Sequence, residues 1–325
     1  MHITVLPQES TKYWLSLDKN KKIKKGIYID ATFGEGGHTE RALELTHGEK
    51  EIIFVGLDWD KNQIKKAQKK YHEEIKNKKL WLFSDNFKNI SQIISSLKKK
   101  IKTKLSVRGV LFDLGMCSNQ LEENRGFSFQ EKEAFLDMRF NQKDNSLTAK
   151  QILNEWQLEK IAQLLKIQGE EKFHYRIAQA IIASRKEGIK LEKVQDLLKI
   201  LEKTVGKAYK KYRLHFATRT FQALRITVNQ ETENISQGLV AALTVLAKAG
   251  RIVAISFHSG EDRLIKNFLR QESRDCLCPP ILPICQCNHQ KKLTIITHKP
   301  IQPTVREISI NPRSHSAKMR VAEKI

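Results

Sequence analysis

A glycine-rich segment follows the first β-type run of the chain. The run Gly26–Asp30 leads into Phe33-Gly34-Glu35-Gly36-Gly37-His38 and then into a helical pattern. Glycines allow a ligand to approach the backbone closely, and the start of a helix offers unpaired N–H groups. Asp58 ends the next β-type run, 21 residues after Gly37. An acidic residue at that distance typically binds ribose hydroxyls, so the two features together predict a site for a nucleoside-containing cofactor.

Two classes of cofactor fit this pattern, the nicotinamide dinucleotides and S-adenosyl-L-methionine. The segment lacks the last glycine of the G-x-G-x-x-G order, and Glu35 would lie unfavourably against a pyrophosphate. S-adenosylmethionine has a positive sulfonium and no phosphate, so acidic neighbours suit it. The residues therefore favour the methyl donor. An NAD-dependent oxidoreductase and a glycine-rich turn without a ligand are the alternatives.

Apolar runs that alternate with helical patterns surround this segment. The expected strands are 26–30, 52–58, 80–83, 109–113 and 251–256, with later β-type runs at 293–298 and 305–310. The expected helices around them are 39–45, 61–78, 216–229, 235–248 (closed by Gly250) and 261–271, and the residues before the first strand form a polar lead-in. This alternation is typical of an α/β fold with a parallel sheet.

The strand rhythm stops after Gly115 and returns near residue 214. Between these points apolar residues such as Ile152, Leu153 and Trp156 recur at helical spacing, and no strand-like run interrupts them. The length of 325 residues also fits about two domains. The sequence thus predicts a discontinuous α/β domain over 1–116 and 214–325 and a helical insertion over 117–213.

The composition indicates a polyanionic partner and excludes a membrane span. With 58 Lys and Arg against 36 Asp and Glu, the net charge is +22. Such a charge favours nucleic acid, although a Lys-, Ile- and Asn-rich chain can also reflect genome base composition. The longest apolar stretch, 238–247, is far shorter than the ~20 residues that a membrane helix needs. The start of the sequence has no signal-peptide pattern, so a cytoplasmic location is expected.

Basic residues provide candidate contacts to nucleic acid. The segment Lys207–Arg213 interleaves Lys and Arg with Tyr, which suits phosphate contact combined with base stacking. A solvated basic loop is the alternative. Arg219, Arg225 and Arg263 are candidates either for phosphate binding or for ion pairs inside the fold.

Four of the five cysteines lie close together, as Cys276-x-Cys278 and Cys285-x-Cys287, with His289 nearby. Four thiols at this spacing could bind a structural zinc ion, although C-x-C is tighter than the common C-x₂-C. An odd number of cysteines in a chain of this length is not a disulfide framework. No metal is expected in the chemistry, and a proline-stiffened loop of reduced thiols is the favoured interpretation.

Short motifs along nearly the whole chain carry a resemblance to one family. They include Tyr28-Ile-Asp-Ala-Thr-Phe-Gly-Glu-Gly-Gly-His38, Asp113-Leu-Gly-Met-Cys-Ser-Asn-Gln-Leu121 and Ser256-Phe-His-Ser-Gly-Glu-Asp-Arg263, and shorter matches at 56–60, 125–129, 136–139, 169–173, 218–226, 228–229 and 311–318. In these motifs the chain resembles the bacterial 16S rRNA (cytosine-N4)-methyltransferase family, RsmH (MraW).

The resemblance implies a Rossmann-like, S-adenosylmethionine-dependent methyltransferase domain with a helical insertion that recognises the substrate. It implies methylation of the N4 amine of a specific cytidine in the decoding region of 16S rRNA, within the small ribosomal subunit. Carried over by position, the cofactor contacts are Gly36, Gly37, His38, Asp58, Phe87, Asp113 and Gln120.

Methyl transfer requires the N4 amine to lie in line with the sulfonium methyl group. Asp113 is the first candidate to act on that amine, since a hydrogen-bond acceptor at N4 favours the attacking form. It could instead orient the amino group of the cofactor's methionine part. Asn229 and His258, with Glu261, are weaker catalytic candidates. Solvent can take the released proton, so no dedicated base is required.

Several of these residues have a structural alternative. Asp30 could bind amides of its own loop, His38 could bind the backbone instead of the cofactor, and Phe87 could belong to the core instead of facing adenine. Asp137 and Arg139 are candidates for an ion pair that fixes the loop over the site.

Three positions depart from the family's motifs. Cys117 and Asn119 replace Ser and Pro in the loop after the fourth strand, and Gly260 replaces Leu. Loss of the proline could loosen that loop. These departures support one alternative function, a non-catalytic ribosome-assembly factor that retains the methyltransferase fold.

Overall fold

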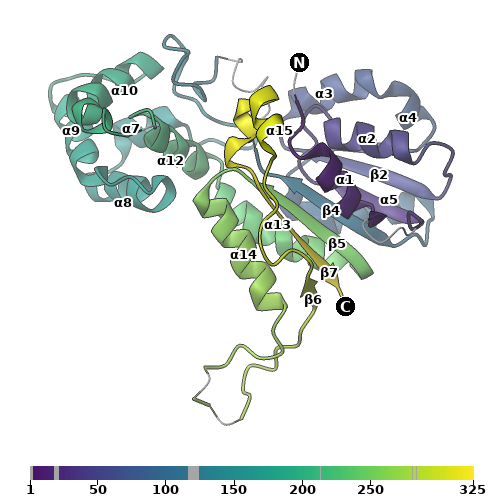
Figure 1. Cartoon of the computed structure of the whole chain (residues 1–325). Coiled ribbons are helices and arrows are strands. Elements are labelled where there is room, and N and C mark those ends of the chain that lie inside the picture. The colour runs from purple at the N-terminus through teal and green to yellow at the C-terminus, as the bar shows by residue number, and fades with distance from the viewer. Residues whose placement is uncertain (1–2, 18–21, 116–123, 213, 280, 283) are drawn as a thin grey trace. The chain divides into compact units, whose positions relative to one another are not determined.

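The computed structural model describes residues 3–17, 22–115, 124–212, 214–279, 281–282 and 284–325. The chain divides into two compact units (Figure 1). Unit 1 comprises 1–115 and 232–325, and unit 2 comprises 116–231. Within the described residues, no helix is both long and apolar enough to cross a membrane.

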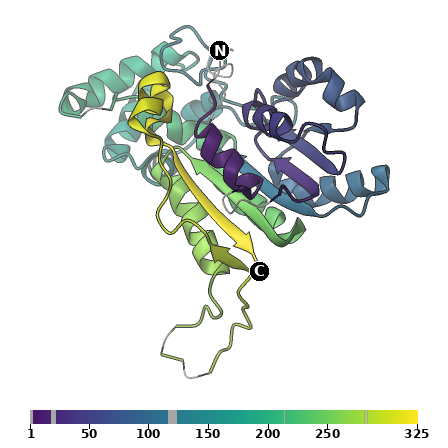
Figure 2. The same ribbon diagram turned by 45° about the vertical axis from the view of Figure 1, so that its right-hand side comes forward.

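Unit 1 is built on one mixed sheet of seven strands in the order β3-β2-β1-β4-β5-β7-β6. The strands are β1 (Gly26–Asp30), β2 (Ile52–Asp58), β3 (Leu80–Ser84), β4 (Val107–Asp113), β5 (Leu246–Ser256), β6 (Leu293–Ile295) and β7 (Lys318–Lys324). β1 to β5 run parallel, whereas β7 is antiparallel to both β5 and β6. In Figure 2 the yellow β7 lies along the green β5. The predicted α/β fold and its first five strands are confirmed. The observed β3 ends one residue later than predicted, β4 begins two residues earlier, and β5 begins at Leu246 instead of 251.

Helices cover both faces of this sheet (Figure 1). Those of unit 1 are α1 (Pro7–Trp14), α2 (Gly37–Leu45), α3 (Lys61–Lys70), α4 (His72–Lys76), α5 (Ile90–Ile101), α13 (Glu231–Val245), α14 (Ser259–Glu272) and α15 (Val305–Ile310), with short 3-10 turns at Phe87–Asn89 and Pro312–Ser316. Ile27 and Ile29 of β1 pack on the face covered by α5, α13 and α14. Tyr28 packs on the opposite face, with α1, α2 and α3. Both faces of β1 are therefore buried, as in a parallel sheet enclosed between two helix layers.

The structure corrects several sequence predictions in unit 1. Residues 305–310 form α15 and not a strand, because the Thr304 hydroxyl caps the helix by accepting from Glu307 N. The helix predicted over 235–248, with Gly250 as its C-cap, instead spans Glu231–Val245, and the left-handed residue after it is Ala249. The polar lead-in contains α1, whose Trp14 is fully buried beside Tyr28.

β7 was not predicted at all. Its two ends are charged, and its buried centre is only four residues long.

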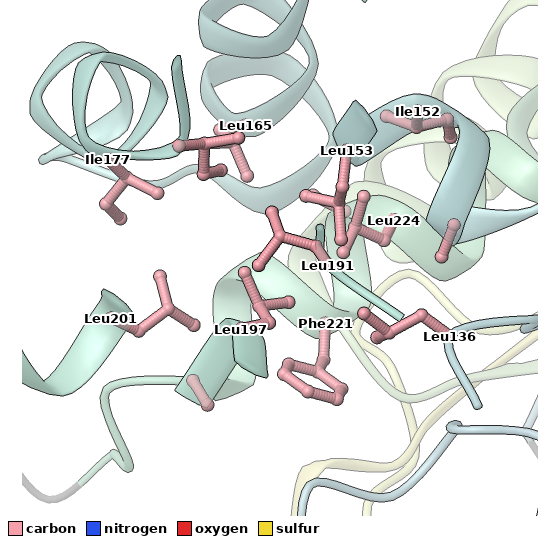
Figure 3. Close-up of a cluster of buried hydrophobic side chains, with 14 of the residues drawn as sticks. Leu136, Ile152, Leu153, Leu165, Ile177, Leu191, Leu197, Leu201, Phe221 and Leu224 are labelled. Carbon is pink, nitrogen blue, oxygen red and sulfur yellow. The ribbon is translucent and has the colours of Figure 1, made fainter. Parts of the chain in front are cut away.

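Unit 2 is helical, as the sequence predicts. It contains α7 (Ala149–Glu155), α8 (Leu158–Gly169), α9 (His174–Lys186), α10 (Val194–Leu201), a π-helical turn (Glu202–Gly206), α11 (Lys207–Tyr209) and α12 (Thr218–Val228). Their apolar stripes meet in one core, in which Leu153, Leu191 and Leu197 point toward one another (Figure 3). Trp156 packs at its margin.

The second boundary of the insertion differs from the predicted one. It falls after Glu231, not after 213, so α12 belongs to unit 2. The reason is packing, since Phe221, Leu224 and Val228 of α12 are buried in the unit 2 core. An added Cβ at Gly169 of α8 would also lie only 2.7 Å from the Arg219 carbonyl oxygen, which shows how closely α8 and α12 approach.

A buried ion pair fixes β7 to α14 in unit 1. Asp262 accepts two hydrogen bonds from the Arg320 guanidinium, at 2.6 and 3.1 Å, and Lys318 lies 3.8 Å away. Burial raises the pKa of Asp262, but Arg320 and Lys318 outweigh it and hold the pKa below its usual value. Asp262 and Lys318 belong to two of the motifs, at 256–263 and 311–318, and Arg320 follows the second of them.

Replacing Asp262 with Asn should therefore destabilise unit 1. The change leaves the Arg320 charge buried without its counter-charge, which typically costs ~3 kcal/mol of unfolding free energy. Chemical denaturation of the purified chain measures the loss. The control is Glu40→Gln, which breaks the half-exposed Lys70–Glu40 pair and should cost less than ~1 kcal/mol. Equal effects of the two changes would contradict this role of Asp262.

Candidate active site

The carboxyl ends of the parallel strands in unit 1 bring the predicted site residues together. β1 pairs with β2 on one side and with β4 on the other, so the strand order changes direction at β1. Ligands of open α/β sheets bind outside the carboxyl ends of the strands at such a point. Asp30, Asp58 and Asp113 are the last residues of β1, β2 and β4.

The glycine-rich turn is shaped by packing inside the protein. Gly36 precedes α2 with φ of 82° and accepts a hydrogen bond from the Tyr71 hydroxyl at 3.2 Å. A Cβ at Gly36 would lie 2.6 Å from that hydroxyl, and one at Gly37 would lie 1.9 Å from Thr4 Oγ1. Gly36, with its positive φ, thus requires glycine whether or not a ligand is bound, whereas a side chain at Gly37 would require Thr4 to move. Their contact with the cofactor stays a prediction.

Asp58 is held by the backbone of two loops. Its Oδ2 accepts from Gly34 N and its Oδ1 from Asp60 N, both at 2.8 Å. Burial raises the pKa of Asp58 to about 7, against the effect of these two hydrogen bonds. A carboxylate offers about four acceptor positions, so two remain for ribose hydroxyls.

His38 connects α1 to the end of β4. Its Nδ1 lies 2.9 Å from Ser10 Oγ and its Nε2 lies 3.2 Å from Asp113 Oδ2. His38 is 5% exposed and Ser10 is fully buried. The ring therefore bonds two side chains, not its own backbone as the structural alternative proposed.

Asp113 has one oxygen in use and one available. Its backbone N–H donates to Thr32 Oγ1 at 2.6 Å, and Oδ2 contacts His38. Oδ1 is buried and has no hydrogen-bond partner among the described residues. A buried acceptor without a donor costs ~1–3 kcal/mol, so this oxygen is suited to an N–H of a ligand.

Asp30 accepts hydrogen bonds from α2 and from its own loop. It is 1% exposed and accepts from the Thr39 hydroxyl at 2.8 Å and from Thr32 N at 3.4 Å. Burial raises the pKa of Asp30 to about 6. The predicted alternative, a hydrogen bond from an amide of its own loop, is present at Thr32 N, and the shorter hydrogen bond comes from α2.

Phe87 lies just after β3 and is partly buried. Its ring meets Phe112 edge-on, with centroids 5.7 Å apart, and a Cβ at Gly238 of α13 would lie 2.5 Å from it. The ring therefore contributes to the core, and its proposed contact with adenine stays a prediction. Gln120 lies outside the described residues, as do Cys117 and Asn119.

The weaker catalytic candidates have structural roles. In unit 2, Asn229 Nδ2 donates to Met138 O at 2.7 Å and its Oδ1 accepts from Phe140 N at 2.8 Å, which clamps a loop where Met138 has φ of 57°. In unit 1, His258 and Glu261 form a capping box at the start of α14. Glu261 is 2% exposed, and its Oε2 accepts from Phe257 N at 2.8 Å.

Three arginines of unit 2 have partners within the unit, two of them carboxylates and one a backbone carbonyl. The Arg139 guanidinium donates to Asp137 at 2.8 and 2.7 Å, as predicted for an ion pair. Arg225 donates to both oxygens of Glu231 at 2.8 Å. Arg219 donates to Glu170 O at 2.6 Å.

The basic segment at 207–213 is only partly available to a ligand. Tyr209 is buried, and its hydroxyl donates to Glu171. Lys207, Lys210, Lys211 and Tyr212 are exposed, and Arg213 lies outside the described residues.

Sequence reasoning missed three residues that support the site, Ser10, Thr32 and Tyr71. Thr32 lies in the first motif next to Asp30, which was a usable signal. Ser10 belongs to α1, which was taken for a lead-in, and Tyr71 breaks the predicted helix 61–78 into α3 and α4. Neither carried a sequence signal of its role.

Comparison with known proteins agrees with this arrangement. The sequence matches the model of the MraW methylase family over residues 1–325. Ribosomal RNA small subunit methyltransferase H of Heliobacterium mobile is 41% identical over 328 residues, covering 100% of this chain and 99% of that protein. The protein of the same name from Halothermothrix orenii is 40% identical over 312 residues, covering 95% of this chain and 96% of that protein. The S-adenosylmethionine cofactor predicted from the glycine-rich segment is that of this methylase family. The chain therefore belongs to the MraW methylase family.

Proposed function

We propose that the protein transfers a methyl group from S-adenosylmethionine to the N4 amine of a cytidine in the decoding region of 16S rRNA, in the small ribosomal subunit. The family match and the relatives named for small-subunit ribosomal RNA support a ribosomal RNA substrate. The N4 target rests on the motif resemblance and on one structural observation, the Oδ1 of Asp113, which has no hydrogen-bond partner among the described residues. The proposed location is the cytoplasm.

The site's charge fits this cofactor. Asp30 and Asp113 lie close enough that the Asp113 charge raises the pKa of Asp30, and Asp30 acts likewise on Asp58. Three neighbouring carboxyls suit a cationic ligand with hydroxyl groups and repel a pyrophosphate. The NAD-dependent alternative is accordingly disfavoured.

When bound, S-adenosylmethionine supplies the electrophilic methyl group. The chain itself binds the cofactor, orients the target amine and polarises its N–H bond. Asp58 offers its free acceptor positions to the ribose, and Asp113 Oδ1 accepts an N–H from the target amine or from the cofactor's amino group. On the amine, that hydrogen bond favours the pyramidal form, in which the nitrogen lone pair can attack the methyl group. Solvent takes the released proton.

RNA binding is assigned to unit 2. Its exposed Lys207, Lys210 and Lys211 can bind phosphates, and the exposed Tyr212 offers a face for a base. Arg225, already paired with Glu231, is the weaker candidate for this role.

Incubation of unmodified small subunits with labelled S-adenosylmethionine, followed by nucleoside analysis of the 16S rRNA, tests the proposal. We expect N4-methylcytidine at one position. Cofactor binding without any transfer would contradict it and would favour the non-catalytic assembly factor. In that case Asn119→Pro is the first reversion to make.

Asp58→Ala should weaken cofactor binding ~10-fold or more, because a hydrogen bond to a charged acceptor contributes ~1.5–3 kcal/mol. The fold should persist, as judged by circular dichroism. Calorimetric titration with S-adenosylmethionine gives the dissociation constant. The matched control is Asp144→Ala, an exposed aspartate of unit 2, which should bind as the unchanged protein does. An unchanged affinity in Asp58→Ala would refute the ribose assignment.

Asp113→Asn should lower kcat by ~100-fold, the range seen when one polar group that acts in the transition state is removed. Cofactor affinity should change much less if Asp113 acts on the target amine. Single-turnover rates at saturating cofactor, measured beside cofactor titrations, separate the two effects. A loss confined to cofactor affinity would assign Asp113 to the cofactor's amino group, and no loss in either would remove it from the site.

A further inference from the structure

The loop between α14 and β6 of unit 1 holds a compact group of thiols. The described residues of this loop, 273–279, 281–282 and 284–292, extend away from the sheet and its helices (Figure 1). Its base is closed by Lys292 N donating to Glu272 O at 2.8 Å and by His289 Nε2, 3.1 Å from Gln271 O. Its described residues form no helix or strand, and a loop of this length usually serves a function or lacks fixed structure.

The four cysteines of the loop have the spacing of ligands around a single ion. Cys276 Sγ lies 3.5 Å from Cys285 Sγ and 3.8 Å from Cys287 Sγ, and the last two are 3.6 Å apart. All four sulfurs, including that of Cys278, lie within 4.8 Å of one another. Zinc–sulfur bonds of ~2.3 Å in a tetrahedron place the sulfurs ~3.8 Å apart. Disulfide bonds would bring two sulfurs to ~2.05 Å.

We propose that Cys276, Cys278, Cys285 and Cys287 bind one zinc ion. Four thiolates in a tetrahedron select zinc or iron, and zinc needs no redox partner. An iron–sulfur cluster is disfavoured, because several iron atoms between the cysteines would spread the sulfurs further apart.

Backbone N–H groups support the four sulfurs. Leu277 N donates to Cys287 Sγ, Cys278 N to Cys276 Sγ and Gln286 N to Cys278 Sγ, each at 3.3 Å. Such donors stabilise thiolate charge and fix the ligands of a metal site. Two of the three hydrogen bonds cross from one C-x-C pair to the other, so the backbone already holds the two pairs together.

The topology of unit 1 separates this ion from the methyl-transfer chemistry. α14 begins after the carboxyl end of β5 and runs back along the sheet, so the loop lies at the amino edge, opposite Asp113. Four protein ligands also leave no open position for a substrate. The ion therefore has a structural role, which is to order the loop.

Metal analysis of the full chain, purified with a thiol reductant and without chelator, tests the site. We expect about one zinc per chain. The double variant Cys285→Ser/Cys287→Ser should lose it, whereas Cys117→Ser, the same exchange at the fifth cysteine, should retain it. Loss of the ion should speed tryptic cleavage at Arg274 and Lys291, while circular dichroism of the rest of the chain stays unchanged.

Replacement of zinc by cobalt gives a second readout, the intense thiolate-to-cobalt absorption of a four-sulfur site. Metal content at background level, stoichiometric iron, or a mass showing disulfides under reducing conditions would each overturn the proposal. So would zinc retained by the double variant. None of these readouts uses methyl transfer, so the experiments test the zinc site independently of the proposed function.

Discussion

The parallel pairing of β1 with both of its neighbours is the constraint on which the candidate site depends. Because β2, β1 and β4 run in the same direction, their last residues meet at one edge, and each of the three is an aspartate. Burial of neighbouring carboxyls is unfavourable, and the protein offsets it with backbone N–H donors at Asp58, a hydroxyl at Asp30 and His38 at Asp113. Among the described residues, Asp113 Oδ1 has no donor and Asp58 keeps acceptor positions, so this edge retains acceptors for a ligand.

Many residues of the family motifs serve the fold before they serve a ligand. Asn229 clamps a backbone loop, Glu171 receives the Tyr209 hydroxyl, and Asp262 binds Arg320. A motif read from sequence alone does not distinguish these roles, because a buried polar residue and a catalytic one are drawn from the same residue types. Only their partners separate them, and for Asn229 and His258 the partners are backbone groups of the chain and a helix cap.

The sequence predicted the parallel strands of unit 1 because each contains a short apolar run, and β1, β2 and β4 end at an aspartate. The sequence-based prediction failed where the local pattern of apolar residues does not indicate which residues are buried. β7 has four buried residues between charged ends, and α15 contains β-branched residues but is largely exposed, with Val305 86% exposed. In the site, strand ends placed Asp58 and Asp113, whereas the contacts of Ser10 and Tyr71 depend on long-range packing. The gathering of the cysteines likewise required the loop's three-dimensional path.

The position of β7 also has a consequence for synthesis of the chain. β7 follows β6 in sequence but lies between β5 and β6 in the sheet, so β6 has no strand to pair with until β7 has been made. Unit 2 is one continuous segment with its own core and can form while the ribosome is still translating. The sheet of unit 1, by contrast, is complete only when β7 is inserted between β5 and β6, which are made before it. Until that step, an unpaired strand edge is open to other chains, so the nascent protein is most prone to aggregation just before β7 emerges.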